Sequence, residues 1–357
     1  MSGPKDDLAG NDPAGQDQSD LFRGTGAHAS LKQSRSERGT PASRLPAFVL
    51  GEELADLADH DDRIAVLTAD LASANRTVEF QARHPERFFD FGIAEKNMVT
   101  AAAGMAACGH IPFAATFASF LGILCAEQIR TDCAYPNLPV RLVAHHSGIA
   151  MGFYGTSHHA LEDLAMMRVI AGLTVVCATD AALLRAILRA SVDHPGAMYI
   201  RLGRGRDADV YDAPPSDFRF GKAIRLREGP DLTIIATGSE VRAALDAAGM
   251  LSKQSGIETR VVDMHTISPL DKAEIRAAAL ETAAILTVEE HNITGGLGSA
   301  VAEVLVECDR VPFVRHGVPD EFALIGPPAA LYSHYGLDAE GIARRARALL
   351  DAGSLDR

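Results

Sequence analysis

The sequence has 357 residues, of which 47 % are hydrophobic, and a formal net charge of -13. This length is enough for about two domains with sizeable cores. The acidic balance argues against a nucleic-acid partner, because phosphate contacts need a basic patch. The five cysteines are dispersed without a Cys-x-x-Cys pair, which is typical of a reduced, cytoplasmic protein.

The N-terminal segment, residues 1–42, is polar and rich in Gly, Ser, Asp and Gln. Such a segment buries too little surface to fold alone, so we expect a disordered extension. Its first residues also lack the apolar stretch of a secretory signal peptide.

A long apolar stretch spans residues 97–126 and has the length of a membrane span. Gly104, Gly109 and Pro112 interrupt it, and it is rich in Ala and Gly rather than Leu. A buried helix, a short strand and a second helix fit this pattern better, so we expect no membrane partner.

Strand and helix patterns alternate over residues 43–225. The predicted strands are 64–68, 112–117, 140–145, 173–177 and 197–201, and the predicted helices are 50–60, a helix that carries Glu95, 121–134 and 181–192. Alternation of this kind predicts an α/β domain whose mostly parallel sheet is covered on both faces.

A second α/β domain is expected over residues 226–357. Its predicted strands are 232–236, 259–263, 284–289 and 311–314, and its predicted helices are 241–254, 272–280, 298–307 and 341–351. The fold class is therefore α/β, with two doubly wound domains.

Polar side chains follow the predicted strands of the first domain. Asp70, His146 and Arg201 fall at strand ends, and Phe120 comes just after one. Ligands of parallel α/β sheets bind beyond the carboxyl ends of the strands, so these residues are candidates for one site.

Glu95 lies at the N-terminal border of the long apolar stretch, within the motif of residues 90–97. A carboxylate at such a border is costly to bury as an anion, so it is expected to be paired, solvated or used in chemistry.

The loop of residues 145–159 contains four histidines and three glycines. Histidine supplies acid, base or hydrogen-bonding groups near neutral pH, which favours catalysis. A zinc site and a purely structural loop are the alternatives. Glu162 and Asp163, which follow the loop, complete no spaced ligand motif that would support zinc.

Two glycine-rich turns, residues 236–240 and 295–298, each lead from a strand into a helix. Each could cradle a phosphate, but neither matches the full dinucleotide fingerprint. Close backbone packing is the favoured interpretation.

These motifs together resemble the transketolase family. The resemblance rests on Asp90-Phe91-Gly92-Ile93-Ala94-Glu95, on Thr116-Phe117 with Phe120, on the histidine loop, on Tyr199-Ile200-Arg201 and on Leu286-Thr287-Val288-Glu289-Glu290-His291. It extends from residue 43 to about residue 345. It implies a thiamine diphosphate pyrimidine-binding domain over 43–225 and a transketolase C-terminal domain over 226–357.

The resemblance also implies roles for the cofactor pocket. Glu95 would hydrogen-bond the aminopyrimidine of thiamine diphosphate and so activate the cofactor. Phe120 would stack on the pyrimidine ring, and Phe117 would line the same pocket. Asp70 is assigned to this pocket as well.

Substrate roles follow from the same comparison. His158 would contact the substrate and assist proton transfer. His146 and Arg201 would bind the sugar phosphate, for which arginine is well suited. Tyr154 and Ala74 stand where many transketolases have an aspartate and a serine, so the ketose donor is expected to differ from the standard pentose phosphates.

The family's diphosphate-binding domain, with its Gly-Asp-Gly…Asn motif, has no counterpart in this chain, which contains no Gly-Asp dipeptide. The resemblance is thus to the C-terminal (B) subunit of a split transketolase. An A subunit would carry that motif and most of the Mg²⁺ contacts, and no metal ligand is expected in this chain. The family implies an A2B2 assembly.

Four functions remain open. Transfer of a two-carbon ketol unit from a ketose phosphate to an aldose is favoured. The alternatives are the β subunit of a 2-oxo acid dehydrogenase E1, a decarboxylating condensation of the deoxyxylulose-phosphate synthase type, and a non-catalytic regulatory homologue. Retention of Glu95, Phe120 and His158 disfavours the last of these.

Overall fold

A seven-stranded sheet forms the first half of the protein, whose computed structural model describes residues 46–204 and 208–355. Its strands are β1 (Ile64–Thr68), β2 (Phe88–Asp90), β3 (Ile111–Phe117), β4 (Arg141–His145), β5 (Thr174–Cys177), β6 (Met198–Arg201) and β10 (Thr266–Ser268). They lie in the order β10-β5-β6-β4-β3-β1-β2, and every neighbouring pair except β10 with β5 is parallel. The predicted extension, residues 1–42, lies outside the described residues.

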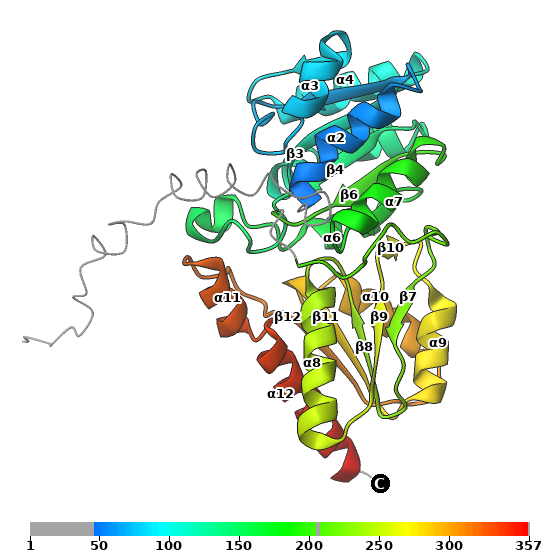
Figure 1. Cartoon of the computed structure of the whole chain (residues 1–357), viewed down its shortest axis with the longest axis vertical. Coiled ribbons are helices and arrows are strands. Elements are labelled where there is room, and N and C mark those ends of the chain that lie inside the picture. The colour runs from blue at the N-terminus through cyan, green and yellow to red at the C-terminus, as the bar shows by residue number, and fades with distance from the viewer. Residues whose placement is uncertain (1–45, 205–207, 356–357) are drawn as a thin grey trace, which may run out of the picture. The chain divides into compact units, whose positions relative to one another are not determined.

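Helices surround this sheet (Figure 1). They are α2 (Pro46–Ala58), α3 (Val78–Arg83), α4 (Glu95–Ala107), α5 (Ala126–Gln128), α6 (Asp163–Arg168) and α7 (Ala181–Val192), with short 3-10 segments η2 (Pro85–Arg87) and η5 (Gly152–Ser157). Helix α7 matches its predicted bounds because Asp180 caps it, the Asp180 Oδ1 accepting a hydrogen bond from the Leu183 amide at 2.8 Å.

The predicted single helix of residues 121–134 is more complex in the structure. It consists of the π-helical segment η3 (Phe120–Leu124), one turn of α-helix in α5, and the π-helical segment η4 (Ile129–Ala134). The apolar pattern indicated a helix, but it did not distinguish the hydrogen-bond spacing of a π-helix from that of an α-helix. Such π segments frequently occur at functional sites, and η3 begins at Phe120.

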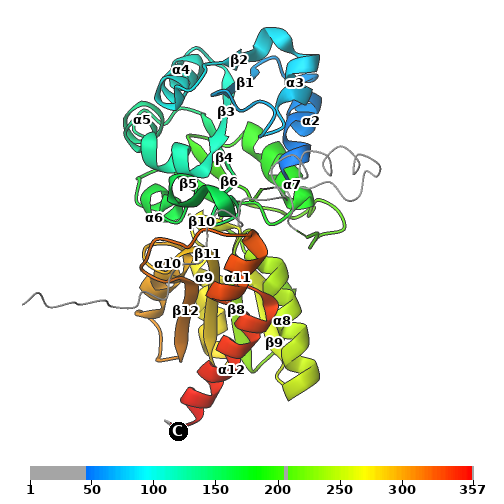
Figure 2. The ribbon, with the colours of Figure 1, turned by 90° about the vertical axis from the view of Figure 1, so that its left-hand side faces the viewer.

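Alternating side chains of the strands enter two cores, which explains the two-sided covering of the sheet. In β1, Val66 packs in a cluster with residues of α2 and α7, whereas Ala65 and Leu67 pack in a cluster with residues of α4. Figure 2 shows α2 and α7 on one face of the strands and α4 on the other. The predicted doubly wound arrangement is confirmed.

A five-stranded sheet forms the second half of the protein. Its strands are β7 (Ile224–Arg227), β8 (Leu232–Ala236), β9 (Thr259–Asp263), β11 (Ile285–Asn292) and β12 (Phe313–Val318), in the order β12-β11-β8-β9-β7. Its helices are α8 (Glu240–Ser255), α9 (Lys272–Glu281), α10 (Leu297–Leu305), α11 (Pro328–Tyr335) and α12 (Ala339–Leu355). Only β7 runs antiparallel to its neighbour.

This second sheet is also covered on both faces. In β8, Leu232, Ile234 and Ala236 pack with residues of α8 and α12. Ile235, between them, joins the cluster that contains residues of α9 and α10. That cluster also includes the α4 side of the first sheet, so one continuous core runs through both halves.

Strand β10 is an element that the sequence did not predict. Although Thr266–Ser268 follows β9 of the second sheet, it pairs antiparallel with β5 of the first sheet, Thr266 opposite Val176. The first sheet therefore includes one strand from the stretch of chain that builds the second sheet. A strand of three residues is too short to show a periodic pattern.

Among the helices that the structure describes, none combines the length and the apolar character needed to cross a membrane.

Candidate active site at the carboxyl ends of the first sheet

Glu95 is the first residue of α4, and its side chain is largely buried, with the residue 8 % exposed. Helix α4 packs against η3 and η4, the segments that begin with Phe120 and Ile129. Burial raises the pKa of the Cys125 thiol, which follows η3, to about 12, and the Glu95 carboxylate raises it further. Within residues 46–204 and 208–355, no group donates a hydrogen bond to Glu95.

Asp90 connects the two strand ends that precede Glu95. Its Oδ1 accepts hydrogen bonds from the amides of Asp70 at 2.9 Å and Gly92 at 3.0 Å. Asp70 itself is exposed and has a positive φ of 57°. The structure therefore brings Asp70 to the same sheet edge as the turn that leads into Glu95, and Asp90 is the residue that fixes this turn.

Five of the predicted site residues form one cluster of rings. Phe117 lies 5.5 Å from Phe120, 4.8 Å from His146 and 5.8 Å from His158, measured between ring centroids. His158 also lies 5.2 Å from Phe120 and 4.8 Å from Tyr154. The end of β3, the start of η3 and the histidine loop thus meet at one place.

The histidines of this cluster are held in defined positions. The Nδ1 atoms of His145 and His146 are 2.6 Å apart, and His146 has a φ of 57°. Burial lowers the pKa of His145 well below its ordinary value, and the neighbouring His146 lowers it further. Burial also lowers the pKa of His158, whose Nδ1 lies 2.8 Å from the Ser157 hydroxyl. Burial therefore favours the uncharged form of His158, which is the form that can accept a proton.

Arg201 does not join this cluster. Its residue is 3 % exposed, and its Nε donates to Asp163 Oδ2 at 2.8 Å. Its Nη2 donates to the carbonyl oxygens of Ala160 and Glu290, each at 3.0 Å. A carboxylate and two carbonyls enclose the Arg201 guanidinium, so these contacts do not support the expected role in binding the sugar phosphate, which stays a prediction.

The sequence reasoning missed the partners of Arg201. Asp163 is fully buried and also accepts a hydrogen bond from the Tyr199 hydroxyl at 2.9 Å. The sequence pattern offered it only as a metal ligand, without a motif to support that role. The one available signal was its place just after the histidine loop, where a buried carboxylate needs a cationic partner.

The glycine-rich turn of residues 295–298 is filled by an internal carboxylate. Glu289 accepts hydrogen bonds from the amides of Leu297 at 2.7 Å and Gly298 at 2.8 Å, at the start of α10. A Cβ at Gly296 would overlap this carboxylate. Burial raises the pKa of Glu289 to about 7, although the two amides lower it. The packing interpretation is confirmed for this turn, because the amides of Leu297 and Gly298 are already paired with Glu289.

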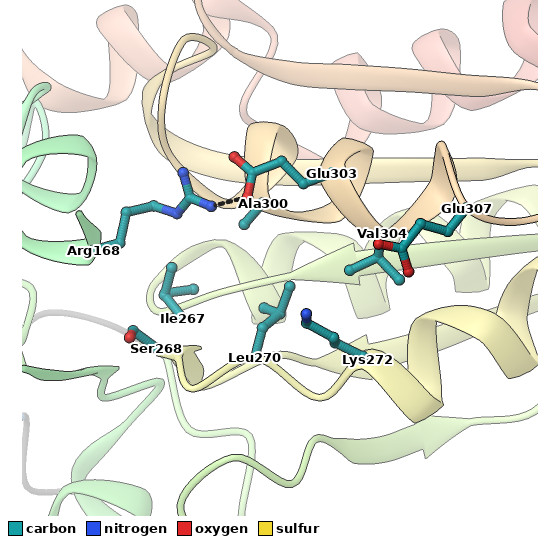
Figure 3. Close-up of a pocket in the computed structure, with 9 residues that line it drawn as sticks. All are labelled: Arg168, Ile267, Ser268, Leu270, Lys272, Ala300, Glu303, Val304 and Glu307. Carbon is teal, nitrogen blue, oxygen red and sulfur yellow. Dashed lines mark hydrogen bonds and ion pairs between the residues drawn. The ribbon is translucent and has the colours of Figure 1, made fainter. Parts of the chain in front are cut away.

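A cavity of about 340 Å³ lies away from these rings (Figure 3). Its lining residues are Arg168, Ile267, Ser268, Leu270, Lys272, Ala300, Glu303, Val304 and Glu307. None of the predicted site residues is among them. Arg168 reaches across it to Glu303, with an Nη2–Oε2 distance of 2.7 Å. In the part of the chain that the structure describes, no three His, Cys, Asp or Glu side chains are grouped so as to hold a metal ion.

Comparison with known proteins gives the family. Residues 47–206 match the model of the transketolase pyrimidine binding domain, and residues 221–342 match that of the transketolase C-terminal domain. The B subunit of the apulose-4-phosphate transketolase of Phocaeicola vulgatus is 39 % identical over 295 residues, which cover 83 % of this chain and 94 % of that protein.

Two further proteins agree with this result. One subunit of the 6-deoxy-6-sulfo-D-fructose transketolase of Clostridium sp. (strain MSTE9) is 42 % identical over 293 residues, which cover 82 % of this chain and 90 % of that protein. A split gene transketolase, solved as an inactive beta4 tetramer, is 42 % identical with a TM-score of 0.76, covering 85 % of this chain and 97 % of that one. The chain belongs to the transketolase family and comprises the two domains of its C-terminal part, as in the B subunits of split transketolases.

Proposed function

We propose that this chain is the B subunit of a thiamine diphosphate-dependent transketolase, which transfers a two-carbon ketol unit from a ketose phosphate to an aldose acceptor. The observation that carries the proposal is Glu95. The residue is largely buried, its carboxylate receives no hydrogen bond from the described chain, and its helix packs against the segment that starts the ring cluster. Such a carboxylate fits a donor group supplied by a ligand.

The residues around Glu95 fit the aminopyrimidine end of the cofactor. Glu95 would hold a proton at a ring nitrogen, Phe120 and Phe117 would offer aromatic faces, and Asp70 would lie at the rim of the same sheet edge. When bound, thiamine diphosphate supplies the nucleophilic carbon that attacks the carbonyl of the donor. The protein's part is to orient the ring and to exclude water from Glu95.

The sugar phosphate would enter on the side of the histidine loop. His158, whose uncharged form is favoured by burial, would accept a proton from a substrate hydroxyl. His146 would donate a hydrogen bond from the base of the cluster, and Tyr154, which is half exposed, would line the entrance. Because Tyr154 replaces an acidic residue of many family members, the donor would differ from the common pentose phosphates.

The other end of the cofactor requires a second protein. Thiamine diphosphate carries a diphosphate that needs a cation and an amide cradle, and this chain has no Gly-Asp dipeptide. We assign that role to an A subunit with a Gly-Asp-Gly…Asn motif, which would hold most of the Mg²⁺ contacts in a cytoplasmic A2B2 assembly. The division of the chain at residue 225 into a pyrimidine-binding and a C-terminal domain belongs to the same proposal.

An assay of the reconstituted enzyme tests the function. This chain is mixed with its A subunit, thiamine diphosphate and Mg²⁺, and release of aldehyde from ketose phosphates is followed together with release of CO2 from 2-oxo acids. We expect aldehyde release that depends on both subunits. CO2 release without ketol transfer would indicate instead the E1 β subunit or a decarboxylating condensation. The absence of both reactions would indicate a regulatory homologue.

A further inference from the structure

The histidine loop is closed at its base by the backbone. The amide of Gly148 donates to the Ala160 carbonyl at 3.2 Å, and the amide of Ala160 donates to the Gly148 carbonyl at 2.9 Å. Between these two residues lie Tyr154 and His158, two of the rings in the candidate site. The positions of both rings therefore depend on the position of this closed loop.

Glu290, in β11 of the second sheet, contacts this loop directly. Its Oε1 accepts a hydrogen bond from the Ile149 amide at 2.7 Å and from the Tyr332 hydroxyl at 2.6 Å. Its Oε2 accepts from the Ser239 hydroxyl at 2.9 Å. The residue is 1 % exposed, so three donors from three separate segments satisfy one buried carboxylate.

The contact between Glu290 and the loop is very close. Gly148 has a φ of 59°, and a Cβ at this position would overlap the Glu290 carboxylate. Glycine is the residue that allows both this backbone conformation and this approach. The other end of the loop is tied to the same strand, because Arg201 Nη2 donates both to the Ala160 carbonyl and to the Glu290 carbonyl.

We propose that Glu290 is a positioning residue of the active site: it anchors the loop of residues 148–160 to the second domain and so sets His158 and Tyr154 for the sugar substrate. Through this contact the C-terminal domain, which supplies none of the predicted site residues, takes part in substrate binding. The role of the loop in binding rests on the proposed function, whereas the anchoring itself does not.

Hydrogen exchange of the full chain, read by mass spectrometry, tests the anchor without any activity. Glu290→Ala removes the acceptor of the Ile149 amide, and exchange in peptides from residues 146–160 should rise by about tenfold or more. Glu290→Gln keeps the shape, since its carbonyl oxygen can face Ile149 and Tyr332 while its amide faces Ser239. It should restore slow exchange.

Glu303→Gln is the matched control. Glu303 is also a glutamate of the second domain that reaches the first, through Arg168, but it lies at the cavity of Figure 3 and does not touch the loop. Replacing the Glu303 carboxylate by an amide should leave hydrogen exchange of the loop unchanged. If Glu290→Ala does not fold, Tyr332→Phe removes one of the donors to Glu290 and should give a smaller rise. Unchanged loop exchange in the folded variant would overturn the inference.

The assembled enzyme with its A subunit gives the second readout. Glu290→Ala should raise the KM for the ketose phosphate about tenfold while kcat changes by less than about threefold, because the residue acts on substrate placement. Glu290→Gln should return KM to within about threefold of the wild type. A fall of about tenfold in kcat without a change in KM would refute the positioning role. If the wild type has no ketol transfer but loop exchange responds as expected, the proposed function fails and the anchor stands.

Discussion

The guanidinium of Arg201 and the carboxylate of Asp163 form an ion pair with an Nε–Oδ2 distance of 2.8 Å and with side chains that are 4 % and 0 % exposed. Tyr199 donates its hydroxyl to the same carboxylate oxygen at 2.9 Å. Two strand residues of β6 thus hold the first residue of α6. The pair therefore joins β6 to α6 beside the candidate site, and its contacts are those of a stabilising ion pair.

Replacement of Arg201 by alanine should therefore destabilise the chain. Removing one partner of a buried ion pair leaves an uncompensated charge, and the free energy of unfolding should fall by about 3 to 5 kcal/mol. Denaturant unfolding followed by circular dichroism measures this change. Arg130→Ala is the matched control, because its ion pair with Glu127 is exposed and contributes less than about 1 kcal/mol. A stable Arg201→Ala with only a raised KM would restore the phosphate-binding role.

Glu95→Gln should abolish turnover while the fold stays intact. The amide has nearly the same shape, but it cannot hold the proton that cofactor activation requires. A loss of at least about a hundredfold in kcat is expected. Turnover is measured in the assembled enzyme, and the thermal midpoint of the chain serves as the test of folding. Glu127→Gln changes an exposed glutamate and should keep its activity; near-normal turnover of Glu95→Gln would remove the proposed mechanism.

Asp263 should make stability depend on pH. Burial raises its pKa from 3.8 to about 7, although hydrogen bonds from the Thr179 and Tyr211 hydroxyls lower it. Because the folded value is the higher one, the stabilisation is complete below about pH 4 and is lost as the pH rises through 7. Relative to Asp263→Asn, the wild type should lose about 3 kcal/mol of unfolding free energy between pH 5 and pH 8. Denaturant titrations at both pH values measure the difference. If the unfolding free energies of the wild type and Asp263→Asn change in parallel with pH, the raised pKa of Asp263 is contradicted.

Tyr154→Asp should shift the choice of donor. The tyrosine ring lies 4.8 Å from that of His158 at the entrance of the site, where an acidic side chain would accept a hydrogen bond from a sugar hydroxyl. The ratio of kcat/KM values for a standard pentose phosphate and the native donor should change by about tenfold. Phe153→Asp places the same charge one residue earlier, on a side chain of similar exposure, and should leave the ratio unchanged. Equal effects of the two substitutions would mean that the charge acts without contact.

The sequence was most informative where a local pattern decides the structure. The apolar runs of β1 and β9 and the capped helix α7 have their predicted bounds, and a helix carries Glu95 as expected. The position of a residue at a strand end was predictable, but the direction of its side chain was not. This is why His146 joins the ring cluster while Arg201, also at a strand end, turns to Asp163.

Contacts between distant segments could not be predicted from the pattern. Glu290 was visible only as part of a family motif, because its role depends on Ile149, which lies 141 residues earlier in the chain. Strand β10 was missed for a related reason, since its partner β5 belongs to the other sheet. Whether Glu95, Phe120 and His158 act on a cofactor and a sugar remains a prediction for the assays above.

The pairing of β10 with β5 means that the first sheet includes a strand from the stretch matched by the C-terminal family domain. A fragment that ends in the linker after β6 would keep β1 to β6 but would expose the amides and carbonyls along the edge of β5. Bare strand edges of this kind pair with other chains and cause aggregation. A fragment limited to β1 to β6 should therefore be less soluble than the full chain, in which β10 covers the edge of β5.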